Sequence, residues 1–137
     1  MLKLMIGVKG TGKTKALVNM VNEACEASKG HVVCLEKGVK LTYDVKHQAR
    51  LINTNDYLVF DAQSLFGFIS GIMASDHDVT DIFVDSAKKI CNDDMVAFEK
   101  MVLELDELAQ KVGVNIVMTA SMPVEDATDV IIKYVVA

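Results

Sequence analysis

The sequence predicts an α/β protein, built as a three-layer αβα sandwich around a mainly parallel central sheet. Short apolar runs alternate along the chain with longer segments of helical spacing, which is typical of successive β-α units. Most of the apolar runs are continuous, as expected of strands that are buried on both faces of a parallel sheet. With 137 residues, the chain is expected to form one domain, residues 1–137.

Six apolar runs are expected to form the strands of this sheet. About half of the residues are apolar, which is enough for a packed core at this length. In chain order, the expected strands are Leu2–Val8, His31–Glu36, Tyr57–Phe60, Asp81–Asp85, Val114–Thr119 and Val130–Val136.

Four segments between these runs are expected to be helices. The clearest is Asn92–Val112, because Asn92, Asp93 and Asp94 supply a cap and acidic charge at its start and Gly113 ends it. Apolar residues then recur along it at helical spacing, which predicts a face turned toward the sheet. The other three expected helices are Lys13–Ser28, Ala62–Ala74 and the shorter Asp44–Ile52.

The composition indicates which kinds of partner the protein can bind and where in the cell it works. The net charge is −5 and Arg50 is the only arginine, which argues against binding to a nucleic-acid backbone. Three cysteines without a Cys-x-x-Cys pair are typical of reduced thiols in a cytoplasmic protein. No apolar stretch approaches the ~20 residues that a membrane helix needs, so no membrane partner is expected.

The strongest motif lies near the start of the chain and reads GVKGTGKT. It fits the pattern G-x-x-x-x-G-K-[ST], with an expected strand before it and an expected helix after it. Its glycines allow the loop to wrap so that backbone N–H groups point at phosphate oxygens. Within it, Lys13 is expected to reach the β- and γ-phosphates, and Thr14 to bind Mg²⁺ through its hydroxyl. The expected nucleotide-binding residues are Gly7, Val8, Lys9, Gly10, Thr11, Gly12, Lys13 and Thr14.

This loop resembles that of the P-loop NTPases. Its inner part, Gly10-Thr11-Gly12-Lys13-Thr14, is the form common in ATPases of the AAA+ and RecA-like branches. The resemblance implies the P-loop NTPase fold, ATP as the ligand and Mg²⁺ as the cofactor. It also implies an acid at the end of a neighbouring strand that helps to hold the metal.

Two aspartates fit that second position. Asp85 follows the apolar run Ile82-Phe83-Val84, and Asp61 follows the run Leu58-Val59-Phe60. Asp85 is favoured as the metal-binding acid, because a long helix and another strand follow it in the order found in RecA-like enzymes. Asp61 has a simpler role as the cap of the helix that begins at Ala62.

The residues for hydrolysis are harder to assign. Many related ATPases carry a glutamate directly after the metal-binding aspartate, and here that residue is Ser86. Glu36 resembles the strand-terminal glutamate that activates water in hexameric replicative helicases; a surface glutamate at a strand end is the alternative. The resemblance also offers Thr119 as a sensor of the γ-phosphate. Arg50 could complete the site only from a neighbouring subunit, the alternative being a residue on a helix surface.

The expected function is therefore ATP binding with slow, Mg²⁺-dependent hydrolysis of the RecA-like type, in which Lys13, Glu36 and Asp85 are catalytic and Thr14 and Asp85 hold the metal. The nucleotide, ATP or ADP, is the expected ligand, with a homo-oligomer or a protein partner as further possibilities. One alternative is a small-molecule kinase similar to the thymidine kinases, although the zinc-binding cysteines and the substrate-covering segment of that family are absent. Another is a nucleotide-dependent binding module without useful turnover, which Ser86 supports.

Overall fold

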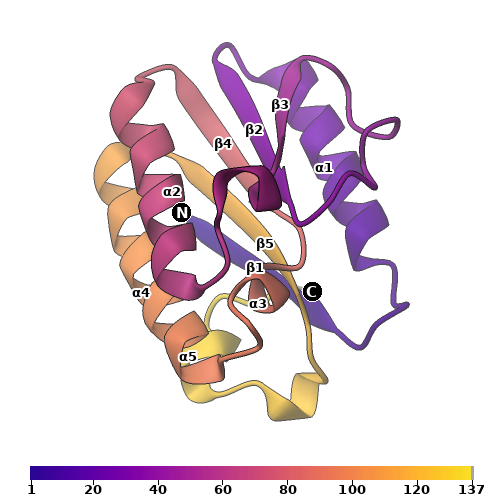
Figure 1. Ribbon diagram of the computed structural model, residues 1–137, viewed down its shortest axis with the longest axis vertical. Coiled ribbons are helices and arrows are strands. Elements are labelled where there is room, and N and C mark those ends of the chain that lie inside the picture. Colours follow the sequence, from indigo (N-terminus) through magenta and orange to yellow (C-terminus); the bar gives the residue numbers. More distant parts are fainter. Residues whose placement is uncertain (137) are drawn as a thin grey trace.

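The computed structural model describes residues 1–136 and contains one five-stranded sheet. The strands lie in the order β1-β5-β4-β2-β3, and all four neighbouring pairs are parallel (Figure 1). The prediction of an α/β protein with a parallel sheet is confirmed. The strands are β1 (Leu2–Gly7), β2 (His31–Glu36), β3 (Ala49–Asn53), β4 (Val79–Val84) and β5 (Asn115–Ser121).

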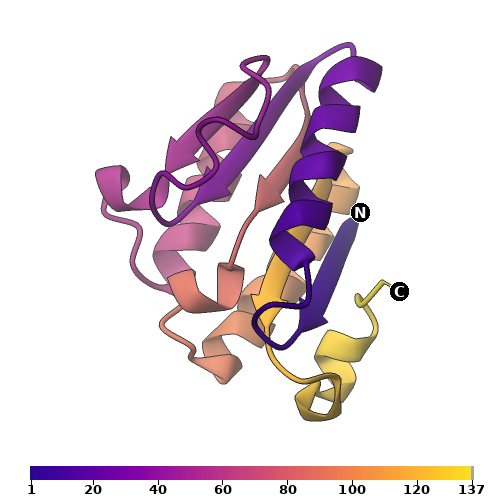
Figure 2. The ribbon, with the colours of Figure 1, turned by 90° about the vertical axis from the view of Figure 1, so that its right-hand side faces the viewer.

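Helices cover both faces of the sheet, as a three-layer sandwich requires. Helix α1 (Lys13–Ala27) lies on one face, and α2 (Ala62–Ser75) and α4 (Met95–Val112) lie on the other (Figures 1 and 2). Each face has its own apolar core: Leu17 of α1 belongs to one cluster of buried residues, and Phe98 of α4 belongs to the other. In the described part of the chain, no helix combines the length and the apolar character that a membrane crossing requires.

The ends of α4 follow the local chemistry of the sequence. Asp94 is the N-cap and accepts a hydrogen bond from Ala97 N at 3.2 Å, and Gly113 ends the helix with a φ of 84°. The predicted helix began three residues earlier, at Asn92. In the structure, Asn92 and Asp93 have positive φ and form a turn between α4 and the short helix α3 (Ala87–Ile90), which the sequence did not predict.

The third strand does not lie where it was predicted. Tyr57 belongs to a 3₁₀ turn (Thr54–Tyr57) and Leu58 has a φ of 61°, so Tyr57–Phe60 is not a strand. The strand is instead β3, which overlaps the end of the segment Asp44–Ile52 that was predicted to be a helix, and that prediction is wrong as well. Because β3 is a short edge strand whose residues are mostly only partly buried, it lacks the continuous apolar run that identifies the inner strands.

The prediction of a last strand at Val130–Val136 is also wrong. The segment begins with a single helical turn, α5 (Asp129–Ile132), whose N-cap Thr128 accepts a hydrogen bond from Ile131 N at 3.2 Å. Only Val135 makes a parallel bridge, to Leu4 of β1. The threonine cap therefore overrides the β-branched composition at the start of this run.

An ion pair joins the start of β2 to the loop after α2. His31 Nδ1 lies 2.6 Å from a carboxylate oxygen of Asp76, and the hydrogen bond and charge of Asp76 raise the pKa of His31 above its usual 6.5. A raised histidine pKa contributes stability at low pH that is lost as the pH rises through the folded-state value. We expect Asp76→Asn to lower the midpoint of the His31 ring signals in an NMR titration. Equal His31 midpoints in both proteins would contradict this pairing.

Candidate functional site

A cleft of about 640 Å³ opens at the carboxyl ends of β1, β4 and β5. This edge is where ligands bind in open parallel α/β sheets, because the loops that leave the strands there run to opposite faces. The residues that line the cleft come from the loop after β1 and the first turn of α1, from the loop after β2, from the ends of β4 and β5, and from α3 and the turn that follows it. They are Lys9, Gly10, Gly12, Lys13, Thr14, Lys15, Lys40, Leu41, Asp85, Ser86, Lys89, Asp93, Thr119 and Ser121.

The predicted phosphate-binding loop forms one wall of this cleft. Gly10 and Gly12 have φ values of 89° and 84°, in the left-handed region that favours glycine. Gly12 is also the N-cap of α1 and supplies no side chain to cap the helix. Within residues 1–136, no acceptor is found for any backbone N–H from Lys9 to Lys15. This run of unpaired donors at a helix N-terminus is suited to an anion.

Lys13 folds back over its own loop. Its Nζ donates a hydrogen bond to Val8 O at 2.9 Å and lies 3.4 Å from the Thr11 hydroxyl, which itself donates to Val8 O at 2.8 Å. The ammonium group is therefore held inside the curve of the loop by a single carbonyl and a hydroxyl. An anionic oxygen that enters the loop can replace these neutral partners with a stronger, charge-assisted bond.

Thr14, Asp85 and Thr119 come together at the floor of the cleft. Asp85 Oδ1 accepts a hydrogen bond from the Thr14 hydroxyl at 3.0 Å and another from the Thr119 hydroxyl at 2.9 Å. The Thr119 hydroxyl in turn accepts a bond from Ser86 N at 2.7 Å. Because β5 lies between β1 and β4, Thr119 stands between the loop and the acid and fixes the orientation of the carboxylate. The structure thus brings together three predicted residues that lie far apart in the sequence.

Glu36 ends β2 beside this group but does not line the cleft. Its side chain is 3% exposed, and its two oxygens accept hydrogen bonds from Lys40 N and Leu41 N, both at 3.0 Å. Burial raises the pKa of the Glu36 carboxyl, the two N–H bonds oppose that shift, and the charge of Asp85 adds to it. Glu36 therefore fastens the loop after β2.

Asp61 and Arg50 lie outside the cleft. Asp61 caps α2, accepting a bond from Ser64 N at 2.8 Å in a reciprocal capping box, and these bonds lower its pKa. This is the simpler of the two roles that the sequence offered for Asp61. Arg50 lies exposed on the edge strand β3, not on the helix surface that was its alternative.

The charge of the cleft differs from that of the whole chain. Five lysines and two aspartates line it, whereas the chain has a net charge of −5. Lys40 and Lys89 were not predicted as site residues, because each is one lysine among many in the sequence. Only their positions soon after the ends of β2 and β4 link them to this edge of the sheet. The local excess of positive charge is suited to an anionic ligand.

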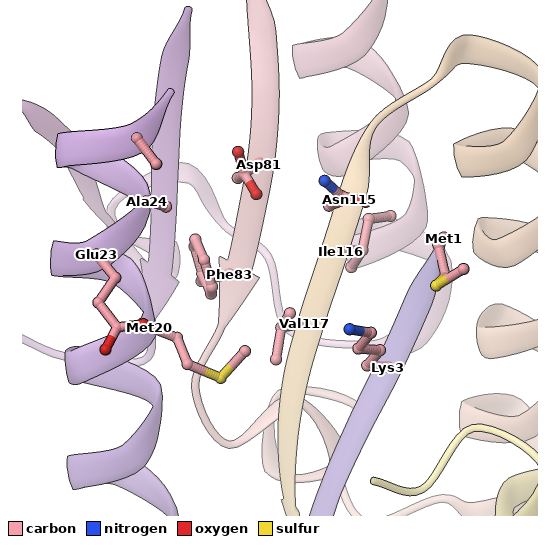
Figure 3. A pocket seen from close by; sticks show the side chains of 11 residues that line it. Met1, Lys3, Met20, Glu23, Ala24, Asp81, Phe83, Asn115, Ile116 and Val117 are labelled. Atoms are coloured by element: carbon pink, nitrogen blue, oxygen red, sulfur yellow. The ribbon is translucent and has the colours of Figure 1, made fainter. Parts of the chain in front are cut away.

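A second hollow, of about 290 Å³, lies between α1 and the three strands β1, β4 and β5 (Figure 3). Met20 reaches from α1 toward Val117 of β5, and Lys3 and Asp81 line the hollow on the strand side (Figure 3). It lies at the opposite end of the strands from the cleft and includes no residue of the glycine-rich loop. We therefore place the candidate site in the cleft.

No protein-family model matches the chain, and the comparison with curated proteins finds no match. The candidate site therefore rests on the geometry of its own residues.

Proposed function

We propose that the chain is a P-loop NTPase of the RecA-like type, which binds ATP with Mg²⁺ in the cleft and hydrolyses it slowly. One observation carries the proposal: Thr14 Oγ1 and Asp85 Oδ1 lie 3.0 Å apart although they are 71 positions apart in the sequence. They meet beside Lys13 and a loop with unpaired N–H groups. One cleft would thus offer N–H groups for the phosphates, oxygen atoms for the metal and a lysine to balance the charge of the phosphates.

The residues at the floor of the cleft fit a magnesium ion. A hydroxyl and a carboxylate are the oxygen ligands that Mg²⁺ uses together with water and phosphate. Thr14 would supply the hydroxyl, and Asp85 would hold the ion directly or through water. The metal would neutralise charge on the phosphates, and Thr119 would keep the Asp85 carboxylate in place.

Hydrolysis needs a group that polarises the attacking water, and Glu36 is the acid that we propose for it. A carboxylate has about four lone-pair sites, so two remain free beside the bonds to Lys40 and Leu41. A second candidate function, nucleotide-dependent binding without useful turnover, is favoured by the position of Glu36. Its side chain is 3% exposed and does not line the cleft.

ADP formation from Mg-ATP distinguishes these functions. If Glu36 activates water, Glu36→Gln should lower kcat at saturating ATP by at least about a hundredfold, the usual contribution of a general base. Equal kcat values for wild type and Glu36→Gln would remove Glu36 from the chemistry. A wild type that binds ATP but forms no more ADP than Lys13→Ala would favour the binding module. ADP formation that requires an added nucleoside would identify a kinase.

The cellular location and the partners of the protein are also proposals. Cys25, Cys34 and Cys91 are free thiols, and burial raises the pKa of both Cys34 and Cys91 to about 12, which makes them unreactive at neutral pH. Free, protected thiols support the cytoplasmic location that we propose. We also propose that the protein acts as a homo-oligomer or with a protein partner, since no residue of the described cleft is an arginine.

A further inference from the structure

The loop after β2 is fixed by a buried carboxylate. Glu36 accepts one backbone N–H on each oxygen, from Lys40 and Leu41, both at 3.0 Å. Burying a carboxylate is costly unless its oxygens accept hydrogen bonds, so the loop and the glutamate stabilise each other. The backbone at Lys40 is therefore held at two successive residues.

Further contacts hold the same loop on both sides. Gly38 N donates to the side chain of Asn53 on β3 at 3.0 Å, and Leu41 is 3% exposed in the core beneath α1. Farther along, Asn22 of α1 donates a side-chain bond to Asp44 O at 3.0 Å. The segment between β2 and β3 is thus attached to both the sheet and α1, although it contains no helix of its own.

This attachment leaves one lysine directed at the cleft. Lys40 lines the cleft, its side chain is exposed, and its Nζ has no hydrogen bond or ion pair with any group in residues 1–136. In the sheet, β2 lies beyond β4, on the side away from β1. Lys40 therefore enters the cleft past Asp85, whereas Lys13 enters it from the loop after β1.

We propose that Lys40 binds the terminal phosphate of the nucleotide and that Glu36 is the positioning residue that holds it there. The proposal rests on the proposed function, because it needs a phosphate chain that runs from the loop at Lys13 toward Asp85. A lysine beyond Asp85 meets the outer end of that chain, which only a triphosphate reaches. Because the backbone of Lys40 is already fixed, less conformational entropy is lost when its ammonium group binds.

Calorimetric binding of Mg-ADP and of a non-hydrolysable Mg-ATP analogue tests the role of Lys40. We expect Lys40→Met to weaken analogue binding about tenfold, as for the loss of one charge-assisted contact, and ADP binding by less than about twofold. Lys37→Met is the matched control, because Lys37 is exposed in the same loop and does not line the cleft. Unchanged analogue binding in Lys40→Met, or equal losses for both nucleotides, would overturn the proposal.

The role of Glu36 is tested through its coupling to Lys40. A glutamine accepts only on its oxygen, so Glu36→Gln loses one of the two loop bonds and should also weaken analogue binding. In the double variant Glu36→Gln/Lys40→Met, we expect a loss within about twofold of that in Lys40→Met alone, whereas independent roles would give additive losses and overturn the positioning role. If Glu36→Gln fails to fold, the comparison of Lys40→Met with Lys37→Met still decides whether Lys40 binds the terminal phosphate. Failure of the wild type to bind either nucleotide would overturn the proposed function as well.

Discussion

Replacing Lys13 with alanine is expected to weaken Mg-ATP binding about a hundredfold, since a well-placed charged hydrogen bond contributes up to about 3 kcal/mol. In the structure its ammonium group donates hydrogen bonds to Val8 O at 2.9 Å and to the Thr11 hydroxyl at 3.4 Å. Both partners are neutral, so a triphosphate offers Lys13 a stronger contact than the loop does. The alanine variant keeps the unpaired N–H groups of the loop, and some binding should therefore remain.

The fold should tolerate this change. Lys13 is half-exposed and lies in the first turn of α1, where its side chain makes no contact that holds the apolar core. We expect the thermal unfolding midpoint to stay close to that of the wild type, so that the loss can be assigned to binding. Lys29→Ala is the matched control, because Lys29 is exposed just beyond the opposite end of α1. Equal affinities for ATP in Lys13→Ala and Lys29→Ala would contradict a phosphate site in this loop.

The parts of the fold that the sequence predicted well are those with local causes. The inner strands β2, β4 and β5 each contain a continuous run of buried residues, because helices cover them on both faces. Helix α4 is bounded by an aspartate cap and a terminal glycine, and both signals lie within a few residues of its ends. Likewise, the eight residues of GVKGTGKT lie in one strand, loop and helix turn, so their mutual positions depend on little else.

The remaining features depend on contacts between distant segments. The edge strand β3 forms because β2 offers a free edge, and this partner cannot be read from Ala49–Asn53 alone. Glu36 could be assigned to the end of a strand, but its bonds to Lys40 and Leu41 depend on the path of a loop that has no regular structure. For the same reason, Lys40 carried no signal in the sequence as a residue of the cleft.

Asp85→Asn is expected to remove most of the dependence of ATP binding on Mg²⁺. The asparagine oxygen can still accept the bonds that Thr14 and Thr119 donate to Asp85, so the shape of the site should persist. What changes is the charge, which a bound Mg²⁺ would need and which would repel metal-free ATP. We therefore compare the affinity for ATP in excess Mg²⁺ with the affinity for ATP in excess chelator, and expect the ratio of the two to fall at least about tenfold in the variant. ATP should bind more weakly in the presence of magnesium and slightly more tightly in the presence of chelator.

Asp61→Asn is the control that shows which of the two candidate aspartates, Asp61 or Asp85, holds the metal. Asparagine is nearly as good an N-cap as aspartate, so this variant should keep α2 and leave the magnesium ratio unchanged. The structure supports this outcome because Asp61 bonds to Ser64 at the start of α2, whereas Asp85 bonds to Thr14 in the first turn of α1. If Asp61→Asn lowers the ratio and Asp85→Asn does not, the metal is held at the start of α2 and the proposed site is wrong. If only Asp85→Asn lowers it, the metal acts where Thr14 and Asp85 meet.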